Sequence, residues 1–334
     1  MSRRVAAAAL LCCLLLPLTA ASTAGADDEV ERGLSVPGAP EVFFYRAADQ
    51  RSAIYETHRS GNLAKIRLAR NWDKDWTHVT PVEIDGDAGT ELLFYRSSDG
   101  RRAIRDVDPN GALTDIRPAV AWQSGWDLIT AIDIDGDNTT ELILYRNDGT
   151  RVVSDIAADG TTTVINDNGG WAANWSHIMP AEVDGDPGKE LIFYRQSTGK
   201  RAIYDIHASG ALAVIRTAGN WSAGWSHVTA MEIDGTAGDE LLFYRADTGK
   251  RAIYDVHPSG ALAAMKLNGK YAKNWTQIVP IELDGDAGSE LLLYRADSGK
   301  RAVYDVHKSG NLILVRRVGR YARNWTNIVA AELS

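Results

Sequence analysis

Short apolar stretches alternate with turn-forming residues over most of the sequence. They are rich in Leu, Ile, Val and Tyr, and signals such as Asp247-Thr-Gly249 and Pro258-Ser-Gly260 separate them. No segment keeps its apolar residues at a helical spacing, so the pattern predicts β-strands rather than helices. In one representative part of the chain the expected strands are Leu241–Arg245, Ala252–His257, Leu262–Leu267 and Trp275–Leu283.

This four-strand pattern recurs with a period of 50 residues, once shortened to 49. A fixed period of this length indicates a solenoid, an array or a propeller. Four short antiparallel strands in about 50 residues suit one blade of a β-propeller. The sequence therefore predicts an all-β, six-bladed β-propeller of four-stranded antiparallel blades within residues 41–334. The repeats are 41–90, 91–140, 141–189, 190–239, 240–289 and 290–334.

The two ends of the repeat region predict how the ring closes. The first repeat begins on the strand Glu41–Arg46, and the last ends on the strand Ile328–Leu333. If the C-terminal strand joins the first blade, two exposed sheet edges disappear. An open array is the alternative geometry.

Five copies of an acidic loop separate the repeats, and each copy runs directly into an apolar strand. Carboxylates occupy loop positions 1, 3, 5 and 9. So much negative charge without a basic residue repels itself unless the oxygens converge on a hard cation, and Ca²⁺ prefers several oxygen ligands at once. A metal-free Asp-Gly hairpin is the alternative. We expect structural Ca²⁺ bound by Glu83, Asp85, Asp87, Glu91; Asp133, Asp135, Asp137, Glu141; Glu182, Asp184, Asp186, Glu190; Glu232, Asp234, Glu240; and Glu282, Asp284, Asp286, Glu290.

The loop and its strand, Glu-Ile/Leu-Asp-Gly-Asp-x-Gly-x-Glu-Leu-Leu, resemble the FG-GAP or VCBS-type repeat of integrin-like β-propellers. The resemblance covers residues 41–334 and implies calcium in the acidic loops. This chain departs from the family by having Glu at position 1 in four loops and Gly at position 7 rather than 6. The fourth loop has Thr236 in place of the third carboxylate, so we expect the weakest site there.

The first 26 residues have the pattern of a secretory signal peptide: Arg3 and Arg4, the apolar run Val5–Leu18, and the small residues Ala24-Gly25-Ala26. Residues 27–40 read as a leader. Both cysteines lie in the signal segment, so we expect a secreted protein without disulfides.

No apolar run after the signal segment could span a membrane. The formal charge of −8, without a basic stripe, argues against nucleic acid.

All ten tryptophans fall in one repeated aromatic pair, Trp-x-x-x-Trp or Tyr-x-x-x-Trp. We expect the second member in the core, because it leads into a strand. The first member is either packed between blades or exposed as a stacking platform for a ligand. The candidate ligand-binding residues are Trp72, Trp122, Trp171, Trp221, Tyr271 and Tyr321.

A second repeated set consists of Tyr-Arg followed, a few residues later, by Arg-Ala-Ile-Tyr-Asp-Val-His. We expect an arginine and the aspartate of this set to form an internal ion pair in each blade. No single acid, base or nucleophile breaks the repeat symmetry, so the sequence predicts a protein that is not an enzyme. It favours a secreted, lectin-like propeller that binds carbohydrate through several weak sites. The alternative is a protein–protein adhesion or scaffold module. Expected partners are glycans or a cell-surface or extracellular protein, and the expected state is a monomer.

Overall fold

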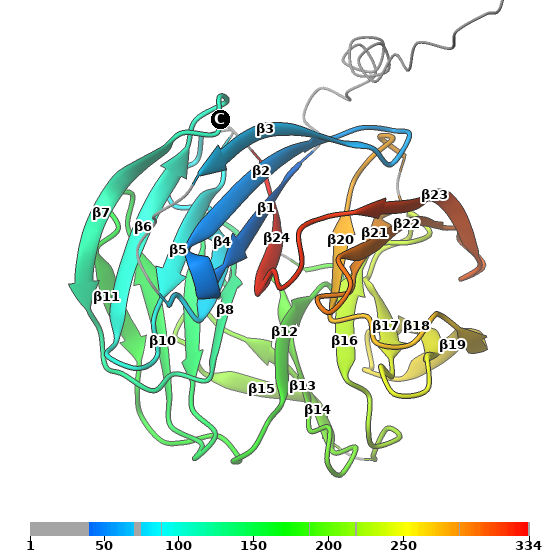
Figure 1. The fold of residues 1–334 in the computed structure, drawn as a ribbon. Coiled ribbons are helices and arrows are strands. Elements are labelled where there is room, and N and C mark those ends of the chain that lie inside the picture. Colours follow the sequence, from blue (N-terminus) through cyan, green and yellow to red (C-terminus); the bar gives the residue numbers. More distant parts are fainter. Residues whose placement is uncertain are drawn as a thin grey trace, which may run out of the picture. The chain divides into compact units, whose positions relative to one another are not determined.

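The computed structural model describes residues 40–69, 75–87, 89–186, 188–217, 219–286 and 288–332. The signal segment, nearly all of the leader and Trp72 lie outside these residues. The described chain forms six four-stranded sheets (Figure 1). In sheet order the strands are β24 (Asn327–Ala331), β1 (Glu41–Arg46), β2 (Arg51–Thr57), β3 (Leu63–Ala69); β4 (His78–Val82), β5 (Glu91–Tyr95), β6 (Arg101–Val107), β7 (Leu113–Ala121); β8 (Leu128–Ile132), β9 (Glu141–Tyr145), β10 (Arg151–Ile156), β11 (Thr162–Asn166); β12 (His177–Ala181), β13 (Glu190–Tyr194), β14 (Arg201–Ile206), β15 (Leu212–Arg216); β16 (His227–Met231), β17 (Glu240–Tyr244), β18 (Lys250–Val256), β19 (Leu262–Lys270); and β20 (Gln277–Ile281), β21 (Glu290–Tyr294), β22 (Lys300–Val306), β23 (Leu312–Arg320). A short 3₁₀ helix, η1 (Ala47–Asp49), follows β1.

Each sheet takes its first strand from the end of one sequence repeat and its other three from the next repeat. The C-terminal strand β24 therefore pairs antiparallel with β1, with Phe43 opposite Val329. Figure 1 shows this strand beside the first three. The prediction of a closed, six-bladed, all-β propeller is confirmed. Closure pairs the edge strands that an open array would leave exposed.

The second strand of each blade forms the core. All five residues of β5, β9, β13, β17 and β21 are buried, because both faces of these strands pack against neighbouring blades. One inter-blade cluster joins Leu242 and Tyr244 of one sheet to Leu291 and Leu293 of the next. The outermost strands contain only half-buried and exposed residues, as a sheet edge in water does.

Side chains at the start of the innermost strands hold neighbouring blades together. The His78 Nε2 atom lies 3.0 Å from the carbonyl oxygen of Asp127 in the next blade. The same contact is made by His227 to the Thr276 carbonyl at 3.2 Å and by Gln277 to the Thr326 carbonyl at 3.1 Å. Each blade is thus linked to the next by a side-chain hydrogen bond as well as by apolar packing.

In five of the six repeats one glycine fixes the position of the aromatic connection. Gly199 has a φ of +75°, and a Cβ atom there would lie 2.0 Å from the Trp221 carbonyl oxygen. The Trp221 amide donates a 2.8 Å hydrogen bond to the Gly199 carbonyl. Only glycine tolerates both the conformation and the close approach.

No helix of the described residues has the length and apolar character needed to cross a membrane.

Candidate functional site

The acidic loops fold around their own first carboxylate. In the fifth loop, the Glu282 Oε1 atom accepts hydrogen bonds from the amides of Asp284 and Gly285, at 3.0 and 2.7 Å. Gly285 has a φ of +78°, which allows the tight turn. The buried Glu290, at the start of β21, accepts a 2.7 Å hydrogen bond from the Leu283 amide. The loop is therefore anchored at both ends by carboxylate side chains.

This folding brings three carboxylates together in every loop. The residues at positions 1, 3 and 9 each offer an oxygen, and these oxygens lie within 4.8 Å of one another. All donors are oxygens of ionisable carboxylates, which is the donor set of a hard cation. The five groups are Glu83, Asp85, Glu91; Asp133, Asp135, Glu141; Glu182, Asp184, Glu190; Glu232, Asp234, Glu240; and Glu282, Asp284, Glu290.

The carboxylate at position 5 does not join these groups. Asp87 and Asp286 each accept a hydrogen bond from the amide two residues later, Gly89 at 2.6 Å and Gly288 at 2.7 Å. Asp137 does the same with the Thr139 amide and hydroxyl. Asp186 is also absent from its group. The fourth loop, with Thr236 at this position, therefore has the same three carboxylates as the others.

Burial makes the last carboxylate of each loop difficult to ionise. Burial is the main cause that raises the pKa of Glu91, Glu190, Glu240 and Glu290 to about 8, and the first two loop carboxylates add repulsion. The pKa of Glu141 is raised to about 7 for the same main reason. Glu240 is fully buried, and neither of its carboxylate oxygens has a hydrogen-bond partner of normal geometry. A cation among the three carboxylates would offset both the cost of burying an ionised carboxylate and the repulsion between the carboxylates.

Sequence reasoning missed a further carboxylate beside these loops. Asp255 of β18 pairs directly with Glu240, and Asp305 of β22 pairs directly with Glu290. Directly opposed residues of an antiparallel pair point to the same face. Repulsion from Asp286 and Asp284 adds to burial in raising the pKa of Asp305. The aspartate of the Tyr-Asp-Val-His motif was visible in the sequence, but only the strand register reveals its neighbour.

The aromatic pairs fill the spaces between blades. The second members are buried or half-buried, as expected. Of the first members, Trp122, Trp171, Trp221 and Tyr321 are half-buried and Tyr271 is buried. An arginine guanidinium covers each of them, with its Cζ atom 4.3 to 5.4 Å from the ring centre. These rings are therefore not open platforms.

The two arginines of each repeat have different contacts from those expected. In the fourth repeat Arg195 donates to the Ala173 carbonyl and lies over Trp175, with Cζ 4.9 Å from the ring centre, whereas Arg201 lies over Trp221. No ion pair between a motif arginine and the motif aspartate occurs in the described residues of this repeat, so the expected Arg–Asp pair is absent from it. The Tyr194 hydroxyl donates to the Ser222 carbonyl at 2.9 Å and accepts from the Trp225 amide at 3.2 Å.

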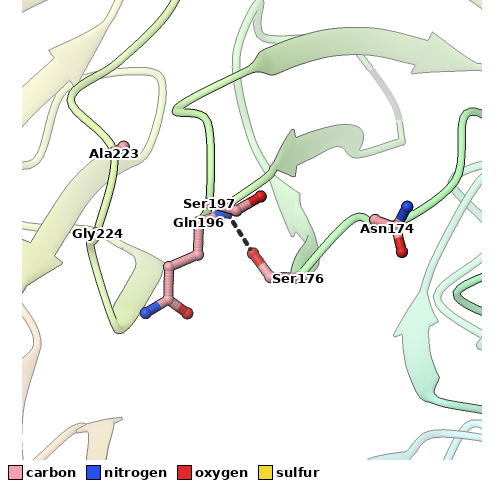
Figure 2. A pocket seen from close by; sticks show the side chains of 6 residues that line it. All are labelled: Asn174, Ser176, Gln196, Ser197, Ala223 and Gly224. Carbon is pink, nitrogen blue, oxygen red and sulfur yellow. Dashed lines mark hydrogen bonds between the residues drawn. The ribbon is translucent and has the colours of Figure 1, made fainter.

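A polar depression of about 620 Å³ lies where three turns meet (Figure 2). Asn174 and Ser176 come from the segment before β12, Gln196 and Ser197 from the β13–β14 turn, and Gly224 from the segment before β16. Figure 2 shows the Ser176 hydroxyl directed at the main-chain amide of Gln196, which donates a 2.8 Å hydrogen bond to it. The Ser176 hydroxyl also lies 3.1 Å from the His177 Nδ1 atom. The depression thus combines hydroxyl and amide groups with a neighbouring imidazole.

The hydroxyl at the same position in a later repeat explains what Ser176 does in the fold. Thr276 precedes Gln277 rather than a histidine, yet its hydroxyl accepts from the Ala296 amide at 3.0 Å in the same way. Ser176 is therefore a turn-stabilising residue, and its proximity to His177 does not by itself make a nucleophile and base.

Comparison with solved structures finds β-propellers that share the fold. A protein from Lactobacillus plantarum matches with 14% identity over 84% of this chain and 81% of its own, at a TM-score of 0.55. A candidate 6-phosphogluconolactonase from Bacteroides uniformis matches with 14% identity over 85% and 82%, at a TM-score of 0.55. The periplasmic gluconolactonase PpgL from Pseudomonas aeruginosa matches with 15% identity over 86% and 81%, at a TM-score of 0.53. No known protein family and no curated protein matches the sequence.

These findings correct three predictions made from the sequence. The resemblance to the FG-GAP or VCBS repeat is wrong, since no family matches and the neighbouring structures include gluconolactonase-type propellers instead. The prediction of a carbohydrate-binding lectin, with adhesion as its alternative, is also wrong, because the fold is shared with a gluconolactonase and arginines cover the supposed stacking rings. The prediction that the protein is not an enzyme fails for the same reason, because propellers of this shape include a gluconolactonase.

Proposed function

We propose that the five acidic loops bind Ca²⁺ and that the bound ions stabilise the propeller. The observation that carries this proposal is the convergence of three carboxylates within 4.8 Å in each loop. It is supported by the full burial of Glu240, whose carboxylate oxygens have no hydrogen-bond partner of normal geometry. Ca²⁺ takes six to eight oxygen ligands in flexible geometry, whereas Mg²⁺ demands a near-ideal octahedron. A bound Ca²⁺ would supply positive charge that keeps all three carboxylates ionised.

Metal titration tests this proposal. Protein stripped of metal is titrated with Ca²⁺ and, separately, with Mg²⁺, and bound ions are counted by mass spectrometry of the retained metal. We expect up to five Ca²⁺ ions per chain and a higher melting temperature with Ca²⁺ than with Mg²⁺. A protein that retains no Ca²⁺ and shows no shift in melting temperature would contradict the proposal.

A second proposed function is hydrolysis of a lactone ring. It is supported by the shared fold with a periplasmic gluconolactonase and a candidate 6-phosphogluconolactonase. Within this chain we assign the substrate to the polar depression of Figure 2, because the side-chain amides of Asn174 and Gln196 offer hydrogen-bonding groups to a ring bearing hydroxyls. Burial lowers the pKa of the adjacent His177 to about 4, so this imidazole is neutral at pH 7 and a weak base.

Proton release from D-glucono-1,5-lactone in weak buffer tests the second function. The rate is compared with spontaneous hydrolysis and with a Gln196→Ala, His177→Gln double variant that has the same melting temperature. A rate above background that the double variant loses supports a lactonase at this depression. A rate equal to background at all protein concentrations removes the proposal.

We also propose that the chain is exported, from the basic start and apolar run at Val5–Leu18. Mass measurement of the protein from the culture medium of an expressing bacterium should give a mature chain that begins near Asp27. An uncleaved chain confined to the cytoplasm would contradict this.

A further inference from the structure

A cavity of about 390 Å³ lies between the sheet β12–β15 and the sheet β16–β19. Its apolar walls are aromatic: Trp221 and Trp225 from the connecting segment, Phe243 from β17 and Tyr254 from β18. The Trp221 and Phe243 rings meet edge to face, with centroids 4.8 Å apart. A volume of this size and a wall of flat rings suit a small planar organic molecule.

Two arginines from the fourth blade also line this cavity, and neither is neutralised. Arg201 is only 7% exposed. Its Nη1 atom lies 3.4 Å from the Gly260 carbonyl, and its Nε atom has no partner. The half-buried Arg216 has its Nη1 atom 3.5 Å from the Ser259 carbonyl, and its Nε atom is also without a partner.

Neither guanidinium forms an ion pair in the described part of the chain. Repulsion from Arg216 adds to burial, which is the main cause that lowers the pKa of Arg201. A buried, unpaired charge with an idle donor is unfavourable, and an anion that enters the cavity would remove the penalty.

Two arginines at equivalent positions in earlier blades have more partners within the protein. Arg117, at the position of Arg216, forms an ion pair with Asp159 at 3.6 Å and donates to the Thr161 hydroxyl at 2.9 Å. Arg151, at the position of Arg201, donates to the carbonyls of Asn166 and Asn168 at 3.1 and 2.7 Å. Arg251 of the fifth blade resembles Arg201, since it donates to the Gly310 carbonyl and its Nε atom is without a partner. The cavity of the fourth blade differs from the site of Arg117 in bringing two guanidinium groups without an acidic partner together.

We propose that this cavity binds a small aromatic carboxylate, with the carboxylate at Arg201 and Arg216 and the ring against Trp225 and Tyr254. The guanidinium fork matches a carboxylate geometrically and forms charge-assisted hydrogen bonds with it. The aromatic walls supply apolar contact that a small inorganic anion could not use. This site is independent of both proposed functions, because it contains none of the loop carboxylates and none of the residues in Figure 2.

Isothermal titration of the Ca²⁺-supplemented protein with three probes tests the site: benzoate, benzamide and acetate. Benzamide keeps the ring without the charge, and acetate keeps the charge without the ring. We expect benzoate to bind with a Kd on the order of 0.1–1 mM and both comparison probes to bind about tenfold more weakly or not at all. Equal binding of benzoate and benzamide, or no benzoate binding up to its solubility, would overturn the proposal.

Matched variants locate the binding. Arg216→Gln and Arg201→Gln should each weaken benzoate binding about ten- to a hundredfold, because a charge-assisted hydrogen bond is lost. Arg117→Gln changes the corresponding residue two blades earlier and should leave benzoate binding unchanged. Since Arg201 is buried, Arg216→Gln remains the deciding variant if Arg201→Gln fails to fold. Unaltered affinity in Arg216→Gln would place benzoate elsewhere and overturn the assignment.

Discussion

Glu240 of β17 lies directly across the ladder from Asp255 of β18, so two carboxylates face the same side at the base of the fourth acidic loop. The Glu240 carboxylate is fully buried without a hydrogen-bond partner of normal geometry, and Asp255 adds to the repulsion that raises its pKa. Such an arrangement is unfavourable in a metal-free protein. It becomes favourable when a cation lies among Glu232, Asp234 and Glu240.

Glu240→Gln should therefore have opposite effects in the absence and presence of Ca²⁺. Without metal, the variant should be as stable as the parent or more stable by about 1–3 kcal/mol, because a buried unpaired carboxyl becomes an amide of the same shape. With Ca²⁺, the variant should lose the stabilisation of one site, about 2.7 kcal/mol at a concentration of 100 Kd. Denaturant unfolding in chelator and in Ca²⁺ measures both effects.

Glu332→Gln is the matched control for this comparison. Glu332 stands after the last innermost strand at the equivalent of loop position 1, but it belongs to none of the five carboxylate groups found in the described residues. Its substitution should leave the Ca²⁺ effect unchanged. Equal loss of stability by Glu240→Gln in chelator and in Ca²⁺ would mean that this carboxylate has no role in metal binding.

The metal-free protein should become less stable as the pH rises from about 5 to 8. The folded-state pKa of Glu91, Glu190, Glu240 and Glu290 is about 8, above the ordinary value of 4.5. Between these values the folded state binds more protons than the unfolded state, so stability falls with increasing pH. Urea unfolding at pH 5.5 and pH 8.0 after metal removal measures the fall.

Saturating Ca²⁺ should abolish this fall, because the metal-bound carboxylates are already ionised. Metal binding should also release protons, and Ca²⁺ affinity should increase with pH over the same range. A metal-free protein whose stability is flat or rises between pH 5.5 and 8.0 would refute the assigned burial of these carboxylates.

His177→Gln should remove a loss of stability that the parent shows in mild acid. Burial and the neighbouring His227 lower the folded-state pKa of His177 from 6.5 to about 4. Between pH 6.5 and 4 the unfolded state binds the proton and the folded state does not, so stability falls as the pH falls through this window. The contribution is on the order of 1–3 kcal/mol.

Glutamine is the matched replacement, because Gln277 already makes the equivalent contact to the next blade at Thr326. At pH 7.5 the variant should match the parent within about 1 kcal/mol. At pH 5 the difference in unfolding free energy should shift in favour of the variant. A parallel pH dependence of parent and variant would show that His177 does not cause the acid sensitivity.

Tyr194→Phe should destabilise the propeller by about 1–3 kcal/mol, because the Ser222 carbonyl and the Trp225 amide both lose their hydrogen-bond partner. Tyr204→Phe removes a half-buried hydroxyl from β14 that makes no hydrogen bond to the described chain, and it should change stability by less than about 0.5 kcal/mol. Thermal unfolding in Ca²⁺ compares the two variants. Similar melting temperatures for both would mean that the Tyr194 hydroxyl does not hold the aromatic connection.

Much of the fold could be read from the chain because its signals are local and repeated. Runs such as Glu240–Tyr244 are apolar on both faces, and glycines such as Gly199 mark turns at a constant distance from them. The acidic loops likewise carry their carboxylates within nine residues, so their convergence at positions 1, 3 and 9 follows from one short turn. The position of Asp286 could not be read in this way, since it depends on which amide its side chain reaches.

The sequence by itself determined the strand order, the number of blades, the closing strand and the five clusters of negative charge. These features depend on period, turn chemistry and residues close together in the chain. Only the tertiary structure decided that Asp255 faces Glu240, that arginines cover the first aromatic of the five pairs whose first member is described, and that Arg201 and Arg216 are left without an acidic partner. The physical reason is that these neighbours come from different strands and blades, and their contacts depend on strand register and side-chain packing.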